Sequence, residues 1–358
     1  MDGTRTAPRL LDTLAEIDGD WLESVLHAAG HSARVREFAI QPIGAGNVSD
    51  TARIVLTTDG DAPASIVAKF RPSTASSHAH GVGSGAYSIE AGAYRLFAAA
   101  TDGCRIPRIL WLAGTDDNIN LVMEDLSRVT RAGDQVAGCG VEDARRVITQ
   151  FARLHRTFWP LASKDAPPWA IRMPSAGDYW VPVLESAVSQ VAQRFADLLP
   201  DRHIALVAEA ATVSRAWHDL RHPAMTITHG DPRVDNVLFD DDAGEAILID
   251  WQVAGVRNPM HDVGYFLSGS VSIEDRRTSE RELLDLYADE FGATRGYVMN
   301  RIVDDYRIQL ISGLMTTAAA VALLPDAPPV NRLLLALLER NCAAVEDWGS
   351  IAAIRRRM

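Results

Sequence analysis

The sequence predicts an α+β fold with two lobes: a small β-rich N-terminal lobe over residues 1–126 and a large, mainly helical C-terminal lobe over 127–358. Three observations carry this prediction. The first half of the chain reads as short strands with one or two helices, whereas long helical patterns dominate from Val141 onward. The chain has 358 residues, more than the roughly 100–200 residues of one domain. Two lobes of this size provide enough surface to form a cleft.

In the N-terminal lobe, the first expected element is a helix that begins at an Asp18 or Asp20 cap and ends at Gly30. Residues 89–100 have helical periodicity as well. Because this second helix is the only one that interrupts the strands, the sheet should be mostly antiparallel. Apolar or alternating runs predict the strands near 35–40, 52–57, 65–70, 108–113 and 119–124.

Residues 73–85, STASSHAHGVGSG, are small, polar and rich in glycine, so we expect a mobile loop with His78 and His80 in solvent. Strands 236–240 and 246–250 form an expected hairpin joined by the acidic turn DDDAG, which suits a solvated turn better than a metal loop. In the C-terminal lobe, helical patterns lie at about 142–158, 178–198, 203–220, 260–268, 279–291, 300–324 and 330–348.

Composition excludes several classes of protein. The formal net charge of −12 argues against a nucleic-acid partner, because phosphate backbones bind basic surfaces. Cys104, Cys139 and Cys342 are odd in number and far apart, which argues against a disulfide framework and a zinc site. The N-terminus has no signal pattern, and the longest apolar run, 318–324, is far shorter than the ~20 residues of a membrane span. We therefore expect a cytoplasmic protein without a membrane partner; its oligomeric state is left open.

The stretch most informative about chemistry is ITHGDPRVDNVLF followed by ILIDWQ. Asn236 comes five residues after Asp231, and Asp250 ends an apolar strand fourteen residues after Asn236. Phosphoryl transfer needs a carboxylate that orients the attacking hydroxyl and oxygen ligands for Mg²⁺. Asp231 suits the first role, and Asn236 and Asp250 suit the second. The hairpin is expected to bring both metal ligands to the same end of a two-stranded ribbon.

These motifs resemble the catalytic core of the aminoglycoside phosphotransferase and choline kinase superfamily, with HGD where protein kinases carry HRD and DWQ where they carry DFG. The resemblance covers roughly residues 35–270 and implies a protein-kinase-like fold. Landmarks most similar to the ecdysteroid-kinase-like branch are the Trp-Gln after Asp250, EDL at 124–126, P-x-H-D-V-G-Y-F-L from Pro259, and FARLHRTFW ending at Trp159.

Lys69 lies in the apolar strand run SIVAKF. Of the 35 basic residues only Lys69 and Lys164 are lysines, so a lysine within a strand indicates a specific role rather than mere charge. In a kinase, such a lysine binds the α- and β-phosphates and pairs with a helix glutamate, for which Glu90 is the best candidate. The alternative is a lysine whose charged end reaches solvent at a strand edge.

Other nucleotide contacts are predicted less specifically. The turn PIGAGNVSD suits a phosphate-covering hairpin formed by Gly44, Gly46 and Ser49, although serine stands where a third glycine is usual and a plain turn would look similar. The resemblance implies that Met123, Glu124 and Leu126 belong to an interlobe hinge whose main chain meets adenine.

Arg233 follows Asp231 by two residues, where many protein kinases place a lysine near the transferring phosphoryl group; a surface or substrate-facing charge is the alternative. By resemblance, Asp262 braces the loop that carries Asp231, and the adjacent His261 is expected to be structural or solvated. Trp180, Trp217 and Tyr265 are candidates for an apolar acceptor pocket, although aromatic residues in a helical lobe are more often core.

The sequence thus predicts a small-molecule kinase that uses Mg²⁺ and ATP, with GTP as the alternative nucleotide, to phosphorylate a hydroxyl group. Its acceptor is left open among an antibiotic such as an aminoglycoside, a steroid-like alcohol and a sugar or choline-like metabolite. A protein kinase is disfavoured because no A-P-E follows Asp250 at activation-loop distance. The alternative from another class is a catalytically silent nucleotide-binding scaffold, which would have no chemical need for Lys69, Asp231, Asn236 and Asp250 together.

Overall fold

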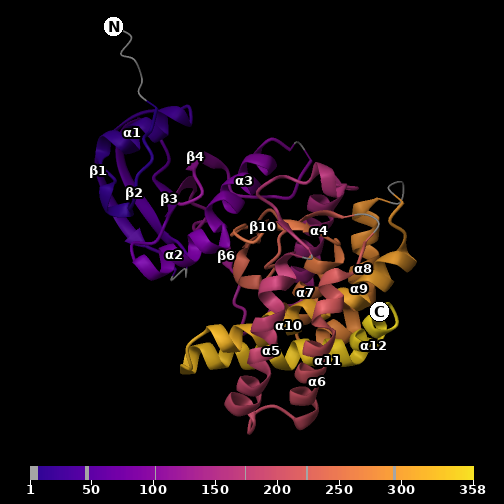
Figure 1. Ribbon diagram of the computed structural model, residues 1–358. Helices are drawn as coiled ribbons and strands as arrows, with labels where there is room; N and C mark the ends of the chain where they lie inside the picture. Colours follow the sequence, from indigo (N-terminus) through magenta and orange to yellow (C-terminus); the bar gives the residue numbers. More distant parts are fainter. Residues whose placement is uncertain (1–6, 45–47, 101, 174, 223–224, 293–295) are drawn as a thin grey trace. The chain divides into compact units, whose positions relative to one another are not determined.

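The computed structural model describes residues 7–44, 48–100, 102–173, 175–222, 225–292 and 296–358. The chain divides into two compact units (Figure 1). Unit 1 consists of Met1–Thr101, Ile106–Thr130 and Asp250–Val253, and unit 2 consists of Asp102–Arg105, Arg131–Ile249 and Ala254–Met358. The short segment Asp250–Val253 therefore belongs to unit 1 although it lies deep in the C-terminal part of the sequence. The predicted α+β fold, with an antiparallel N-terminal sheet and a mainly helical remainder, is confirmed.

Unit 1 is built on a five-stranded antiparallel sheet in the order β1-β2-β3-β5-β4. Before the sheet, the Asp18 side chain caps the first α-helix by accepting a hydrogen bond from Trp21 N at 2.7 Å, as expected of a helix-capping aspartate. The elements are η1 (Leu14–Glu16), α1 (Gly19–Ala28), β1 (Ser32–Pro42), β2 (Asp50–Asp61), β3 (Ser65–Phe70), α2 (Ala75–Ser84), α3 (Ala86–Ala98), β4 (Ile109–Gly114) and β5 (Ile119–Glu124).

The core of unit 1 lies between α1 and one face of the sheet. Trp21 on α1 packs edge-on against Phe70 on β3 and Trp111 on β4, with ring centroids 5.8 and 5.6 Å apart. Alternate residues of β2, such as Ile54 and Leu56, point into the same cluster, as the two-residue period of a strand requires. This packing fixes β3, the strand that carries Lys69.

The expected mobile loop at 73–85 is wrong, because Ala75–Ser84 forms helix α2. The small, polar residues of this segment give no apolar helical pattern. At least one of them is small because of packing, since a Cβ at Gly81 would lie 2.3 Å from the Tyr87 hydroxyl. His78, predicted to be solvated, stacks on Tyr87 and bonds through Nε2 to the Asp117 carbonyl at 2.8 Å. His80 is exposed, as expected.

Unit 2 is mainly helical, with two three-stranded sheets of short strands in the orders β10-β9-β6 and β7-β11-β8. Its longer helices are α4 (Val141–Thr157), α5 (Ser175–Phe195), α6 (Asp201–Asp219), α7 (Met260–Ser270), α8 (Ile273–Phe291), α9 (Met299–Gln309), α10 (Ile311–Leu323) and α11 (Pro328–Trp348). The shorter elements are β6 (Arg131–Ala132), η2 (Ser163–Asp165), β7 (Ile171–Arg172), β8 (Thr226–Thr228), η3 (Val234–Asn236), β9 (Val237–Asp240), β10 (Glu245–Leu248), β11 (Gly255–Arg257) and α12 (Ser350–Arg355).

The helix expected at 300–324 is divided at Leu310 into α9 and α10. Together, Met299–Leu323 are long and apolar enough to cross a membrane by length and composition alone, with a mean hydropathy of 1.2. However, 72% of that window is buried inside the protein. Core helices of globular proteins meet the same criterion, so the stretch is explained by its packing.

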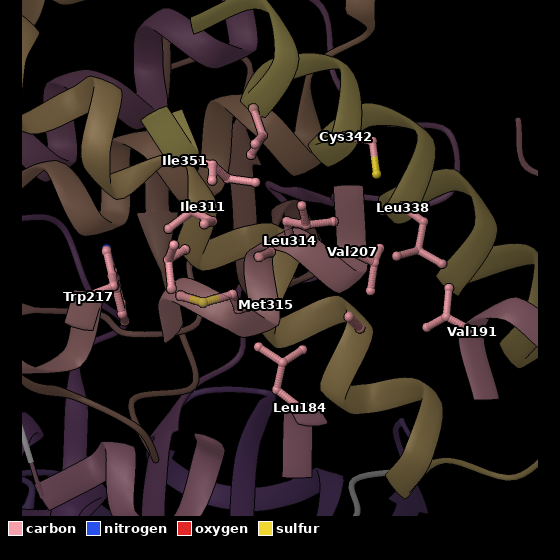
Figure 2. Close-up of a cluster of buried hydrophobic side chains, with 14 of the residues drawn as sticks. Leu184, Val191, Val207, Trp217, Ile311, Leu314, Met315, Leu338, Cys342 and Ile351 are labelled. Atoms are coloured by element: carbon pink, nitrogen blue, oxygen red, sulfur yellow. The ribbon is translucent and has the colours of Figure 1, made fainter. Parts of the chain in front are cut away.

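An apolar cluster packs α5, α6, α10, α11 and α12 of unit 2 against one another (Figure 2). Leu314 and Met315 of α10 lie at its centre, and Cys342 is also fully buried there, so this thiol serves as a core residue. The remaining labelled members come from α5, α6, α10, α11 and α12: Leu184, Val191, Val207, Trp217, Ile311, Leu338 and Ile351. Trp217 is therefore a core residue, the alternative left open by the sequence.

Two short strands frame the HGD loop, which we define as residues 229–236. β8 ends directly before the loop and β9 begins directly after it. β9 and β10 form the predicted hairpin, with Val237 opposite Leu248, and its exposed turn contains Gly244 at φ 68°. The Ile249 N–H continues the ribbon by donating to the Asn236 carbonyl at 3.1 Å. The loop is thus anchored at both ends by main-chain pairing.

Candidate active site

In unit 1, Lys69 occupies a central strand of the sheet, opposite Thr51 on β2 and Leu121 on β5. Its side chain is only 9% exposed. Nζ lies 2.6 Å from Glu90 Oε1 on α3 and 2.8 Å from Asp250 Oδ1. The structure therefore brings together three of the predicted residues, and Lys69 is not a strand-edge lysine that reaches solvent.

These charges determine one another's ionisation. Burial favours the neutral amine of Lys69, but the Asp250 and Glu90 carboxylates outweigh it and raise the lysine pKa above its usual value. Burial also raises the pKa of Glu90, against the opposing effect of Lys69, and the negative charge of Asp250 adds to the increase. The Lys69 ammonium is thus shared by two carboxyl groups, and the oxygen atoms of Asp250 suit a hard divalent cation.

The backbone at Asp250 is unusual. Among the non-glycine residues that the structure describes, Asp250 alone has a positive φ, at 66°. Such a conformation costs roughly 1 kcal/mol or more, and it persists where surrounding contacts enforce it. The next residue, Trp251, is fully buried against Phe97 with centroids 4.3 Å apart, and its main chain hydrogen-bonds Glu90. Gln252 donates to Asp250 Oδ2 at 3.3 Å, so each residue of the DWQ motif helps to hold the turn.

Among the predicted phosphate-covering residues, Gly44 has φ 75° and Ser49 is buried, whereas Gly46 lies outside the described residues. Ile43 N donates to the Thr51 carbonyl at 2.8 Å, which closes the β1–β2 connection. A glycine at 44 is required by its left-handed backbone.

The segment expected to contact adenine ends strand β5. Met123 and Leu126 are buried, and Glu124 pairs with Arg108 twice, through its main-chain N–H at 3.0 Å and its Oε1 at 2.8 Å. The neighbouring Asp125 accepts hydrogen bonds from Arg53 and Ser65. The segment is thus held firmly in place.

In unit 2, the HGD loop places three predicted residues in contact. The Arg233 Nε donates to both oxygens of Asp231, at 3.0 and 3.1 Å. The Asn236 amide donates to the Asp231 carbonyl at 2.9 Å and to Oδ2 at 3.2 Å. Because the amide nitrogen of Asn236 is used in these bonds, its oxygen remains the atom suited to a cation.

Asp231 has the properties of an ionised, reachable carboxylate. Its side chain is 25% exposed. Burial tends to raise its pKa, but the Arg233 charge and hydrogen bonds outweigh burial and lower the pKa below the usual value. The negative charge of Asp231 in turn raises the pKa of Arg233. Asp231 is therefore negatively charged at neutral pH and accepts hydrogen bonds.

Asp262, on the first turn of α7, braces the HGD loop. Its two oxygens accept hydrogen bonds from His229 N at 2.6 Å and Gly230 N at 3.0 Å, and His155 Nε2 lies 3.0 Å from Oδ2. Burial would raise the Asp262 pKa, but the bond from His155 and the nearby histidine rings lower it well below its usual range. Asp262 thus holds two main-chain groups just before Asp231. His261 was expected to be structural or solvated; it is buried, which agrees with a structural residue.

Three supporting residues were not singled out by the sequence analysis. His155 lies on α4, and it is part of the FARLHRTFW landmark, which was the one sequence signal that could have pointed to it. Gln135 accepts from Val234 N at 2.8 Å and donates to the Gly269 carbonyl at 2.9 Å, which ties the HGD loop to α7. Asn258 accepts from Met260 N at 2.8 Å and donates to the buried Asp305, also at 2.8 Å. These contacts join residues more than 30 positions apart or lie in a loop, so no local pattern reveals them.

The sequence analysis considered Tyr265 as pocket lining or as a core residue. The structure instead places its hydroxyl 3.1 Å from Asp231 Oδ1, as a hydrogen-bond donor. Within the described ranges, no group of three or more His, Cys, Asp or Glu side chains is arranged to hold a metal ion. A cation at Asn236 or Asp250 would therefore need further oxygen ligands from phosphate or water, which is how Mg²⁺ is usually bound beside nucleotides.

Solved structures of similar fold include kinases of small molecules. A choline/ethanolamine kinase family protein from Mesorhizobium loti is 14% identical, with 89% of this chain and 92% of that chain covered and a TM-score of 0.50. Choline kinase LicA from Streptococcus pneumoniae is 13% identical, with 92% and 98% covered and a TM-score of 0.50. The amicoumacin kinase hAmiN is 12% identical, with 87% and 89% covered and a TM-score of 0.54. At these identities the likeness shows the fold.

No curated protein matches the chain. The family model described as "Phosphotransferase enzyme family", abbreviated APH, matches residues 39–297. This range includes Lys69, Glu90, the HGD loop, Asp250 and Asp262. Because the match spans well over half of the sequence and contains both groups of contacting side chains, the chain belongs to the APH phosphotransferase enzyme family.

Proposed function

We propose that this phosphotransferase transfers the γ-phosphoryl group of ATP to a hydroxyl group of a small molecule in the presence of Mg²⁺. The observation that carries the proposal is the state of Asp231: a charged, partly exposed carboxylate held in a loop braced by Asp262. Such a carboxylate accepts a hydrogen bond from an attacking hydroxyl, orients its oxygen and accepts the proton as the new bond to phosphorus forms.

The nucleotide phosphates are assigned to Lys69, with Glu90 positioning its ammonium. The 2.6 Å pair supports this role, because it fixes Nζ on a rigid strand. Asn236 and Asp250 are the proposed metal ligands, and their oxygen atoms fit a hard divalent cation. When bound, Mg²⁺ would neutralise part of the negative charge of the phosphates. The amicoumacin kinase of similar fold was solved with AMP-PNP and Ca²⁺, which is consistent with a nucleotide and a divalent cation; GTP remains the alternative nucleotide.

For Arg233 we propose a second role after nucleotide binding. In the structure its guanidinium is paired with Asp231. A γ-phosphate beside the loop would attract the same positive charge, because it offers more negative charge than one carboxylate. Arg233 would then contact both the carboxylate and the transferring group, as the sequence position suggests.

The proposed acceptor is a hydroxyl compound other than an aminoglycoside. The similarity of the EDL, DWQ and YFL landmarks to the ecdysteroid-kinase-like branch favours a largely apolar alcohol. The net charge of −12 favours a cationic antibiotic, but overall charge does not locate a carboxylate at the acceptor position. The landmarks are the more specific of the two observations.

A single screen tests the function and the acceptor. ADP formation from ATP and Mg²⁺ is measured alone, with kanamycin-like aminoglycosides and with apolar alcohols. We expect stimulation by a member of the second group that is insensitive to moderate salt, because burial of apolar surface is insensitive to it. Efficient, strongly salt-dependent phosphorylation of aminoglycosides would overturn the acceptor assignment. Nucleotide binding without any transfer, to these acceptors or to water, would indicate the silent scaffold instead.

A further inference from the structure

Tyr265 and Asp262 lie one turn apart on α7, the helix that follows β11. Asp262 holds the main chain of the HGD loop at His229 and Gly230. Tyr265 reaches the same loop one residue later: its hydroxyl donates to Asp231 Oδ1 at 3.1 Å. Since side chains three residues apart share one face of a helix, α7 contacts both the main chain and the carboxylate of the loop.

We propose that Tyr265 is a positioning residue whose hydroxyl fixes the Asp231 carboxylate in the orientation that receives the acceptor hydroxyl. The inference rests on the proposed function, in which Asp231 orients the acceptor. It adds a residue of α7 to the machinery assigned to the HGD loop and the nucleotide site.

Tyr265 differs from the other hydrogen-bond donors to the Asp231 carboxylate in the element from which it comes. Arg233 and Asn236 belong to the same loop as Asp231, so they move with the carboxylate if the loop shifts. Tyr265 belongs to a helix that is buried along its whole length and packs against α9, α10 and α11. A bond from this rigid helix defines where the carboxylate lies within unit 2, and a rigid supporting residue is what a precisely oriented carboxylate requires.

The environment keeps the Tyr265 hydroxyl protonated. Tyr265 is 4% exposed, and burial, together with the negative charge of Asp231, raises its pKa well above the ordinary value of a tyrosine. Asp231 is ionised, as argued above. The hydrogen bond therefore runs from tyrosine to carboxylate throughout the neutral range, and Tyr265 does not exchange roles with Asp231.

The test is Tyr265→Phe, which removes the hydroxyl and keeps the ring. ADP release from ATP and Mg²⁺ is measured with water as the acceptor, over a range of ATP concentrations. A hydrogen bond to a charged group corresponds to about a 10- to 100-fold effect. We expect kcat to fall by about this factor while the KM for ATP stays unchanged, because Tyr265 acts on the acceptor side of the reaction.

Tyr306→Phe is the matched control. Tyr306 is also a fully buried tyrosine of unit 2 whose hydroxyl donates to a carboxylate, that of Glu280 on α8. Tyr306→Phe also removes a buried tyrosine hydroxyl that donates to a carboxylate, but at a position away from the HGD loop. A general effect of losing a buried hydrogen bond would therefore appear in both Tyr265→Phe and Tyr306→Phe. We expect Tyr306→Phe to lower the melting temperature and to leave kcat unchanged.

Asp231→Asn separates this inference from the proposed function. If Asp231→Asn lowers turnover by about 100-fold or more while a folded Tyr265→Phe protein turns over like wild type, the positioning role is wrong and the proposed function stands. If Asp231→Asn itself retains wild-type turnover, the proposed function fails first. The double variant gives a further check: Tyr265→Phe should reduce turnover no further once Asp231 is asparagine, since the two residues act as one unit. Additive losses would contradict the proposal.

Discussion

The Lys69 ammonium nitrogen lies 2.6 Å from Glu90 Oε1, within a strand–helix pair of unit 1 in which both side chains are at least 90% buried. A buried ion pair contributes little net stability, because desolvation of two charges offsets their attraction. In a chain whose only other lysine is Lys164, this buried lysine is better explained by the position that the pair gives to its nitrogen.

The first prediction concerns the identity of this cation. Lys69→Arg keeps the charge, but the planar guanidinium places its donors differently and disturbs the contacts with Glu90 and Asp250. We expect turnover to fall by about 100-fold or more, by analogy with the loss of one preorganised donor. The control is Lys164→Arg, which makes the same change at the exposed second lysine. Wild-type kinetics for a folded Lys69→Arg protein would refute the phosphate role.

Asp250→Asn isolates the charge of the proposed metal ligand. Asparagine tolerates the left-handed backbone at φ 66° nearly as well as aspartate does, so the fold should be kept. Because the negative charge is lost, we expect turnover to be abolished and Mg²⁺ to lose its effect on nucleotide binding, measured by titration calorimetry. Asp242→Asn in the exposed turn is the matched control. Mg²⁺-dependent activity of the Asp250→Asn protein at the wild-type level would show that Asp250 is not a metal ligand.

Asp262→Asn tests the bracing of the HGD loop. The carboxylate holds two main-chain N–H groups and lies beside the His155 ring. An amide in its place turns one acceptor into a donor within a fully buried cluster, so we expect a loss of about 2–4 kcal/mol in the free energy of unfolding. Urea unfolding measures it, with the exposed Asp304→Asn as control. A loss equal to that of the control would show that the brace is unimportant.

Stability should depend on pH through the buried histidines. Burial lowers the pKa of His261 to about 4, from an ordinary 6.5. As pH falls from 6.5 toward 4, His261 becomes protonated in the unfolded chain but stays neutral in the folded protein. The contribution of His261 to the free energy of unfolding is therefore full above pH 6.5 and is lost progressively below it. This one group contributes about 3 kcal/mol over that window, and the lowered pKa values of His218 and His222 act in the same direction.

Urea unfolding at pH 7.5, 6 and 5 checks this pH dependence. His261→Gln should lose less stability than wild type over the same range, whereas His80→Gln, a change at an exposed histidine, should follow the wild-type curve. Parallel curves for wild type and His261→Gln would contradict the prediction.

The sequence predicted the elements whose signals are local. The D-x4-N spacing placed Asp231 and Asn236 in one loop, and the capping aspartate marked the start of α1, because such patterns depend on near neighbours. The Lys69 strand and the Glu90 helix were also identified, and the structure brings these two side chains together.

Features that depend on tertiary packing were not predictable. α2 was missed because its small residues carry no apolar period, and only the close approach to Tyr87 explains Gly81. The Tyr265 contact joins residues 34 positions apart, and it depends on how α7 packs against its neighbours. The positive φ of Asp250 occurs directly before the fully buried Trp251, and neither the backbone conformation nor the burial has a local signal in the sequence.

The most direct test of the central claim is the turnover of Asp231→Asn. Asparagine keeps the size of the side chain and removes the charge that orients the acceptor, so nucleotide binding and the melting temperature should stay near wild type. We predict that kcat falls by about 100-fold or more, while the control Asp242→Asn remains fully active. A folded Asp231→Asn protein with wild-type kcat would contradict the assignment of Asp231 and, with it, the proposed phosphoryl transfer.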